Sequence, residues 1–173
     1  MASIIKANKF QDFAGNDILS SDGAGVITPN AAGIKNTPAF FVTQASAQAL
    51  ANNTSVTLTF GTTVFDTDSA MSSTTFTVPS GKAGKYFMIG FARIQALNGT
   101  SDFAVLQLAN SGRSTVYNSN VQSGNSGYGY AAITVSCARD LSVGDTVSLF
   151  AYGSEGINIA DGNCNLTIYK LIA

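Results

Sequence analysis

Asp66 and Asp68 are the residues whose type and spacing come closest to forming a chemical site. They flank Thr67 in a stretch that is expected to form a turn after a strand-like run. Paired carboxylates bind calcium through their oxygens, so both aspartates are candidate calcium ligands. A complete calcium loop needs more oxygen ligands, and none follows at a matching spacing. A solvated turn is therefore the favoured interpretation, and we expect no bound metal and no cofactor.

Catalytic groups cannot be assembled from this composition in any usual way. The chain contains no His, which removes the usual general base near neutral pH and the commonest metal ligand. A Ser-His-Asp triad and a Cys-His pair are both excluded. The 10 acidic residues are scattered over predicted turns, and nothing singles out a facing pair. We therefore expect that the protein is not an enzyme.

Three tyrosines lie in or beside the segment from Asn118 to Tyr130, which is rich in Gly, Ser and Asn. Tyr117, Tyr128 and Tyr130 are candidates for an exposed loop that binds a saccharide or a protein. The same composition also suits an inert exposed loop, so both interpretations stay open.

The charge of the chain is low: Lys, Arg, Asp and Glu make up 11% of its residues, against about 25% in an average soluble domain. The net charge of −1 gives no electrostatic footprint for nucleic acid. No stretch reaches the roughly 20 apolar residues of a membrane span, and none near the N-terminus resembles a signal peptide. With 45% hydrophobic residues, either a partner covers part of the surface or that surface is rich in uncharged polar groups.

Strand signals dominate the chain from Pro38 onward, and the one helix-friendly stretch, Gln44–Asn52, is short. Short strands at this spacing are typical of a β-sandwich or barrel, so the expected fold class is all-β. The strands are predicted at Ala39–Thr43, Ser55–Phe65, Thr74–Val78, Gly84–Ala96, Asp102–Leu108, Ser114–Asn118, Tyr130–Ala138, Asp145–Tyr152 and Asn163–Leu171.

Residues 1–37 differ from the rest, because their apolar content is too thin for a core of their own. Strand-like pieces at Ser3–Phe13, Asp17–Ser20 and Val26–Thr28 alternate with turn signals. We expect this segment to lie on the main domain or on a partner chain, with disorder as the alternative. The predicted organisation is an N-terminal segment, 1–37, followed by one domain, 38–173.

The predicted strand from Gly84 to Ala96 has two apolar faces, one with alternate residues from Phe87 to Arg93 and one with those from Tyr86 to Ile94. In a sandwich only one face of a strand meets the core, so the second face predicts packing against another subunit. The predicted subunit-interface residues are Tyr86, Met88, Ile94 and Tyr169.

Two motifs carry a family resemblance: Thr75–Phe91, with its Pro and Ala-Gly-Lys-Tyr-Phe elements, and Leu141–Leu149, with Gly-Asp-Thr-Val, followed by Asn165–Leu171. In this order they resemble the globular head of the first complement component, within the tumour-necrosis-factor-like jelly-roll superfamily. Val64–Asp68 also looks like a family element. The resemblance implies a jelly-roll β-sandwich of about eight to ten antiparallel strands that assembles as a homotrimer.

The N-terminal segment, through Ile5–Asn8 and Gly15–Thr28, is similar to the opening of small structural and tail-fibre proteins of tailed phages. The two resemblances together imply a trimeric virion protein, either a capsid decoration or a short fibre knob, attached to other virion proteins through residues 1–37. The alternative is a tail-fibre module that recognises a host surface saccharide or protein. Neither implies nucleic-acid binding or membrane insertion, and the expected location is the capsid or tail surface.

Overall fold

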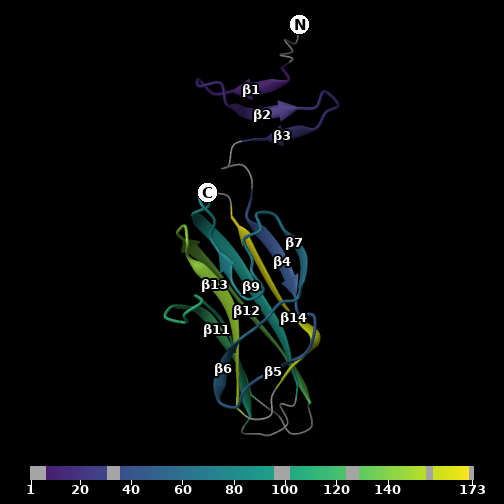
Figure 1. The fold of residues 1–173 in the computed structure, drawn as a ribbon, viewed down its shortest axis with the longest axis vertical. Coiled ribbons are helices and arrows are strands. Elements are labelled where there is room, and N and C mark those ends of the chain that lie inside the picture. The colour runs from purple at the N-terminus through teal and green to yellow at the C-terminus, as the bar shows by residue number, and fades with distance from the viewer. Residues whose placement is uncertain (1–6, 31–35, 96–101, 124–128, 155–157, 172–173) are drawn as a thin grey trace. The chain divides into compact units, whose positions relative to one another are not determined.

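The protein was analysed as a computed structural model that describes residues 7–30, 36–95, 102–123, 129–154 and 158–171, apart from the side chains of residues 160–162. It divides into two units, an N-terminal unit up to residue 36 and a head from residue 37 to 171. Every regular element among the described residues is a β-strand (Figure 1). The predicted all-β class is therefore confirmed.

The N-terminal unit contains a three-stranded antiparallel sheet in the order β1 (Lys9–Gln11), β2 (Asp17–Ser21) and β3 (Ile27–Pro29). Its two turns are held by aspartate side chains. Asp12 accepts the backbone N–H groups of residues 14 and 16, both at 2.9 Å, and Asp22 does the same for residues 24 and 26. Aspartate favours turns because its carboxylate can replace a backbone acceptor in this way.

The head consists of two layers of strands (Figure 1). The larger sheet has the order β12 (Tyr130–Leu141), β9 (Gly84–Gln95), β14 (Asn158–Lys170), β4 (Ala39–Thr43) and β7 (Thr62–Asp66), and β5 (Gln48–Ala49) also pairs with β14. The smaller sheet has the order β11 (Val116–Ser123), β10 (Phe103–Ala109), β13 (Thr146–Gly153) and β8 (Phe76–Thr77). All these strand pairs are antiparallel, and β6 (Thr54–Thr57) contacts β13.

The core of the head fills the space between the two sheets. Phe76 of the smaller sheet packs its ring against Phe40 and Tyr86 of the larger sheet, with ring centroids 5.2 and 5.6 Å apart. Gly90 leaves room for Leu149, because a Cβ at Gly90 would overlap the leucine side chain. Aliphatic side chains from both sheets complete one continuous cluster, so the head has its own core.

Several predicted strands differ from the structure in their bounds, and one differs in its topology. The single strand expected at Ser55–Phe65 is divided into β6 and β7, because the chain leaves one sheet and enters the other between them. Leu58 donates its N–H to the carbonyl of Leu149 on the smaller sheet, whereas Phe65 pairs with Phe41 on the larger sheet. The helix-friendly stretch Gln44–Asn52 contains β5 and no helix.

Candidate functional site

The faces of β9 are the reverse of the sequence-based expectation. Tyr86, Met88 and Ile94 were predicted to pack against another subunit, but all three are fully buried inside a single head. They point at the smaller sheet, whose side chains cover them. The alternate residues of β9 lie on the outer face of the larger sheet, and they include the half-buried Phe87 and Phe91. The interface prediction is therefore wrong for Tyr86, Met88 and Ile94.

This outer face carries aromatic side chains on four neighbouring strands. Strand register places Phe87 of β9 beside Tyr169 of β14, and their ring centroids lie 5.6 Å apart. One row further, Phe41 of β4 is paired with Phe65 of β7, with centroids 6.4 Å apart. Phe65 is 47% exposed and Tyr169 is 36% exposed, so these two rings contact solvent when the chain is alone. We call these four residues the aromatic face.

Charged groups flank the aromatic face along β9 and β12. Lys85 lies 3.9 Å from Asp140, and both side chains are largely exposed. In the other direction along the strands, the Arg93 guanidinium sits 4.0 Å from the centroid of the Tyr130 ring. The rows between these charges hold aromatic, aliphatic and small polar side chains. Contiguous exposed apolar surface with a polar rim is typical of a protein–protein interface.

The sequence held a signal for the orientation of β9. Arg93 alternates in phase with Phe87 and Phe91, and a charged residue within a strand of a sandwich favours the outer face. Gly90, in phase with Tyr86, marks the face on which another backbone or side chain approaches closely. Tyr169 was also predicted to lie at a subunit interface, and it lies on the aromatic face beside Phe87. Its role in a subunit interface stays a prediction.

Donors of the protein itself engage the carboxylates of Asp66 and Asp68. The Asp66 carboxylate accepts the backbone N–H groups of Ala70 at 3.1 Å and Met71 at 2.9 Å, and that of Asp68 at 3.3 Å. Asp68 instead pairs with Lys82 at 3.2 Å. Since both carboxylates are engaged by protein donors, the solvated turn predicted from the sequence is in fact a hydrogen-bonded one. Among the described residues, no group of three or more His, Cys, Asp or Glu side chains gathers to hold a metal.

The ion pair between Asp68 and Lys82 is partly buried and perturbs its neighbours. Desolvation raises the pKa of Asp68, but hydrogen bonds from Thr67 and Lys82 and the charge of Lys82 outweigh it and lower the pKa overall. Tyr86 lies close by and donates its hydroxyl to the Lys82 carbonyl at 2.5 Å. Burial, aided by the Asp68 charge, raises the pKa of Tyr86 to about 12. This group holds the turn to the beginning of β9.

The three tyrosines predicted for an exposed loop do not form one site. Tyr117 is half-buried within β11 and donates its hydroxyl to the carbonyl of Thr146 at 3.0 Å, so the loop prediction is wrong for this residue. Tyr130 begins β12 and is 55% exposed. Arg139, near the other end of β12, donates to the Tyr117 carbonyl, which separates Tyr117 from Tyr130 by most of that strand. Tyr128 lies outside the described residues.

The sheet of the N-terminal unit is amphipathic. Strand register aligns Phe10, Leu19 and Pro29 in one row, and Ile27 lies on the same face of β3. The adjacent row of Lys9, Ser20 and Thr28 points the other way. Phe10 and Ile27 are largely exposed, because none of the described residues of this unit covers their face. The described part of this unit therefore presents an apolar face to solvent.

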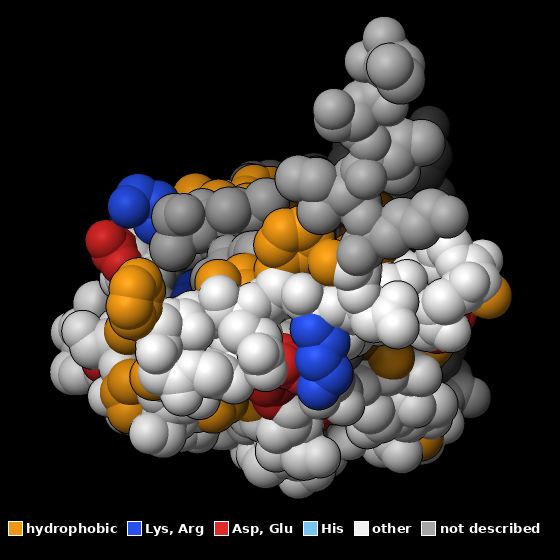
Figure 2. Space-filling view, turned by 90° about the horizontal axis from the view of Figure 1, so that it is seen from above, with side chains coloured by type: hydrophobic (Ala, Val, Ile, Leu, Met, Phe, Trp, Pro, Cys, Tyr) orange, Lys and Arg blue, Asp and Glu red, His pale blue; other side chains and the backbone are white. Residues whose placement is uncertain are grey.

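Charge is sparse on the surface as well as in the sequence. In the view of Figure 2, hydrophobic and uncharged polar surface surrounds a few isolated Lys, Arg, Asp and Glu side chains. Among the described residues, no helix is long and apolar enough to span a membrane. The low charge predicted either a covered surface or a neutral polar one, and the structure shows a wide uncharged polar surface beside the partly exposed aromatic face.

Comparisons with known proteins identify the fold. No protein-family model matches the chain, and no curated protein matches it in sequence. The globular domain of the zebrafish complement 1qA protein matches with a TM-score of 0.57 at 16% identity, over 79% of this chain and 98% of that one. Crystalline murine APRIL at pH 8.0 matches with a TM-score of 0.56 at 12% identity, over 77% and 98%. These likenesses confirm the expected jelly-roll fold.

Proposed function

We propose that the protein is a non-enzymatic structural subunit that assembles as a homotrimer through the aromatic face. We further propose that it acts on a phage virion, as a capsid decoration or a short fibre knob attached through its N-terminal unit. The observation that carries the proposal is the cluster of partly exposed rings on the outer face of the larger sheet. The absence of His from the sequence supports a role without catalysis.

The free energy gained when apolar surface is removed from water supports assembly through the aromatic face. Burying apolar surface stabilises a complex by about 25 cal/mol for each Å² removed from water. Phe41, Phe65, Phe87 and Tyr169 form one contiguous surface, and buried aromatic side chains dominate the energy of many interfaces. The likeness to the complement head and to APRIL in fold supports a closed assembly of identical subunits over a contact with an unrelated partner.

Analytical ultracentrifugation of the whole chain tests the trimer. We expect the wild-type protein to sediment as a trimer and the double variant Phe65→Glu/Tyr169→Glu to sediment as a folded monomer. Both side chains are already partly exposed, so the substitutions leave the core of the head intact. Val121→Glu is the matched control, because Val121 is exposed on β11 of the other sheet and should leave the trimer unchanged. A wild-type protein that is monomeric at all accessible concentrations would exclude the proposed assembly.

Attachment through the N-terminal unit is supported by its amphipathic sheet. Phe10 and Ile27 face solvent on one side of a sheet that has no core of its own. The similarity of Gly15–Thr28 to the opening of phage structural proteins favours a virion protein as the covering partner. On this proposal, residues 1–37 bind the particle while the head projects from it.

Particles purified from a phage whose copy of this gene is disrupted provide the test of attachment. Added full-length protein should bind these particles, whereas a chain lacking residues 1–36 and the variant Phe10→Ser/Ile27→Ser should not. Thr28→Ser, on the polar face of the same sheet, should bind as the wild type does. Particle binding by the truncated chain would show that the N-terminal unit is not the attachment segment.

A further inference from the structure

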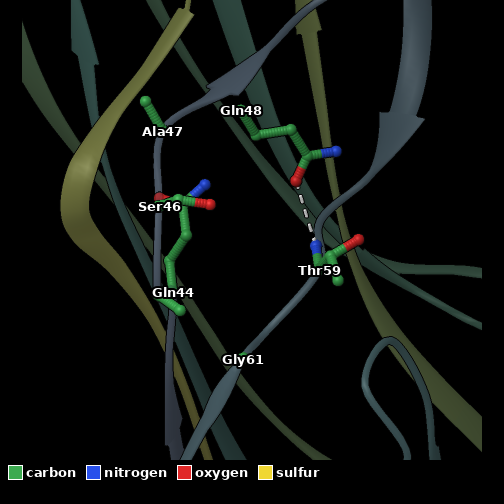
Figure 3. A pocket seen from close by; sticks show the side chains of 7 residues that line it. Gln44, Ser46, Ala47, Gln48, Thr59 and Gly61 are labelled. Carbon is green, nitrogen blue, oxygen red and sulfur yellow. Dashed lines mark hydrogen bonds between the residues drawn. The ribbon is translucent and has the colours of Figure 1, made fainter.

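We propose that a pocket between the segment from Gln44 to Gln48 and the segment from Thr59 to Gly61 binds one neutral, polyhydroxylated ligand, a single sugar unit (Figure 3). The pocket has a volume of about 320 Å³. This inference rests on the pocket alone and is independent of the proposed role on a virion.

The pocket forms where the chain leaves the larger sheet and returns to it. Gln44 directly follows β4 and donates its N–H to the Cys164 carbonyl of β14 at 2.9 Å. The next residues arch away from the sheet until Gln48 begins β5 and pairs with β14 again. Strand β14 is irregular over the same interval, between Ile159 and Cys164. The arch, residues 45–47, therefore arises where the pairing of neighbouring strands with β14 is interrupted.

The Gln48 side chain holds the wall of the pocket opposite the arch. It makes hydrogen bonds to the backbone there that a neighbouring strand would otherwise make. The Gln48 side chain donates to the Thr57 carbonyl at 3.0 Å and accepts the Thr59 N–H at 3.1 Å. The second of these bonds is drawn in Figure 3. Gly61 allows the arch to come close, since a Cβ there would lie 2.5 Å from the Cβ of Ala45. Both walls are thus held in place before any ligand arrives, which lowers the cost of binding.

The Gln44 side chain is the feature that points to a ligand. It is only 5% exposed, yet neither its amide nitrogen nor its amide oxygen has a hydrogen-bond partner in the protein. In Figure 3 its amide end faces the space between the arch and Thr59. Buried polar groups in native proteins are nearly always paired, so an unpaired buried amide at the wall of a pocket points to a ligand. That ligand has to supply both an acceptor and a donor.

The lining selects the chemistry of the ligand. None of the described residues that line the pocket is charged or aromatic, so an ion or a stacked ring finds no counterpart there. Ser46 and Thr59 add hydroxyl groups to the free amide of Gln44. Two neighbouring hydroxyls of a sugar can accept from the amide NH₂ and donate to its oxygen at the same time. About ten waters would also fill this volume, and the experiment must distinguish them from a sugar.

Nuclear magnetic resonance on the ¹⁵N-labelled full chain provides the test. The probes are the methyl glycosides of glucose, galactose and mannose, and the signals followed are the Gln44 side-chain NH₂ pair, assigned by their absence from the Gln44→Met variant. A ligand of about a dozen non-hydrogen atoms is expected to bind with a Kd of about 1 mM. We therefore expect saturable shifts of this NH₂ pair with at least one of the three glycosides.

Two pocket variants and one control decide between sugar and water. Gln44→Met keeps the side-chain length but cannot hydrogen-bond, and Ser46→Leu fills the mouth from an exposed position. Both should weaken binding at least tenfold, measured on backbone signals of the pocket, while Gln122→Met on the exposed strand β11 should not. If no glycoside shifts the Gln44 signals up to its solubility, the pocket holds water only and the inference is wrong. Binding that survives both pocket variants would overturn it equally.

Discussion

Two aspartates separated by a single residue have different roles in this protein. Asp66 is the acceptor for the backbone of the turn that follows it, and Asp68 is the anion of an ion pair with Lys82. The sequence indicated a turn here and left calcium as an alternative. It could not show how each carboxylate is engaged, because Lys82 lies further along the chain and is brought close to Asp68 only by the fold.

Replacing Asp66 with Ala should lower the free energy of unfolding by about 1–3 kcal/mol, because the N–H groups of Ala70 and Met71 lose their acceptor. Chemical denaturation monitored by near-ultraviolet circular dichroism of the tyrosines measures the change. Asp140→Ala is the control, since Asp140 is exposed and its partner Lys85 is 3.9 Å away.

Added calcium or a chelator should leave the wild-type Tm unchanged, because a bound ion would stabilise the folded state. A calcium-dependent rise in Tm would contradict this assignment.

The pKa of Asp68 predicts how the head responds to acid. Its pKa is lower in the folded protein than the reference value of 3.8, so the unfolded chain binds a proton at this site more readily. The stabilisation is therefore fully present above about pH 4 and is lost as the pH falls through the folded pKa. Unfolding free energies measured at a series of pH values should decline below that range, and Asp68→Asn should make the decline shallower. Asp140→Asn should leave the curve unchanged, and an equal slope for Asp68→Asn would refute the argument.

At the scale of a strand, alternation in the sequence identified the two faces of β9 but assigned them wrongly to core and surface. Both faces are apolar, so the average hydrophobicity of a face could not decide which one lies inside. The deciding residues are Arg93, which belongs outside, and Gly90, which lies opposite Leu149. The same limit applies to the predicted strand Ser55–Phe65, where the change of sheet between β6 and β7 depends on partners far along the chain.

Gly90→Ala tests the packing of the two sheets directly. The added methyl group would overlap the Leu149 side chain, and overpacking of a core typically costs about 1–3 kcal/mol. We expect a lower Tm with the trimer retained. Gly112→Ala is the matched control, since no atom lies within 4 Å of a Cβ added there. Equal stability of the two variants would show that the sheets are less tightly packed at this point than the structure indicates.

Side-chain hydrogen bonds join the two sheets where the edge strands β11 and β12 lie next to each other. Strands β11 and β12 belong to different sheets, and asparagine side chains of β11 bond to the backbone of β12. Asn118 donates to the Ser136 carbonyl at 2.6 Å and Asn120 donates to the Thr134 carbonyl at 2.9 Å. These bonds occupy carbonyl groups of an edge strand that would otherwise be free to pair with another chain. This edge is therefore less open to pairing with another chain than an unprotected edge strand would be.

At the scale of the whole molecule, the N-terminal unit and the head differ in how much of their apolar surface they bury. The head has a continuous core, from Phe40 and Phe76 to Leu149, and carries partly exposed rings on the outer face of its larger sheet. The N-terminal unit has one apolar face and no core. The composition predicted this contrast, because the apolar residues are sparse before Pro38 and dense after it. It could not predict which partner covers the N-terminal sheet, since partner contacts leave no local pattern in one chain.

Removal of residues 1–36 should leave a head that folds and assembles as the full chain does. Its core lies entirely within residues 37–171, so the main thermal transition should keep its Tm. If the aromatic face drives assembly, the truncated chain should still sediment as a trimer, and adding Phe65→Glu/Tyr169→Glu to it should produce monomers. A truncated wild-type head that is folded but monomeric would place the assembly contacts in the N-terminal unit instead. That result would leave the aromatic face, with its partly exposed Phe65 and Tyr169 rings, without a role in assembly.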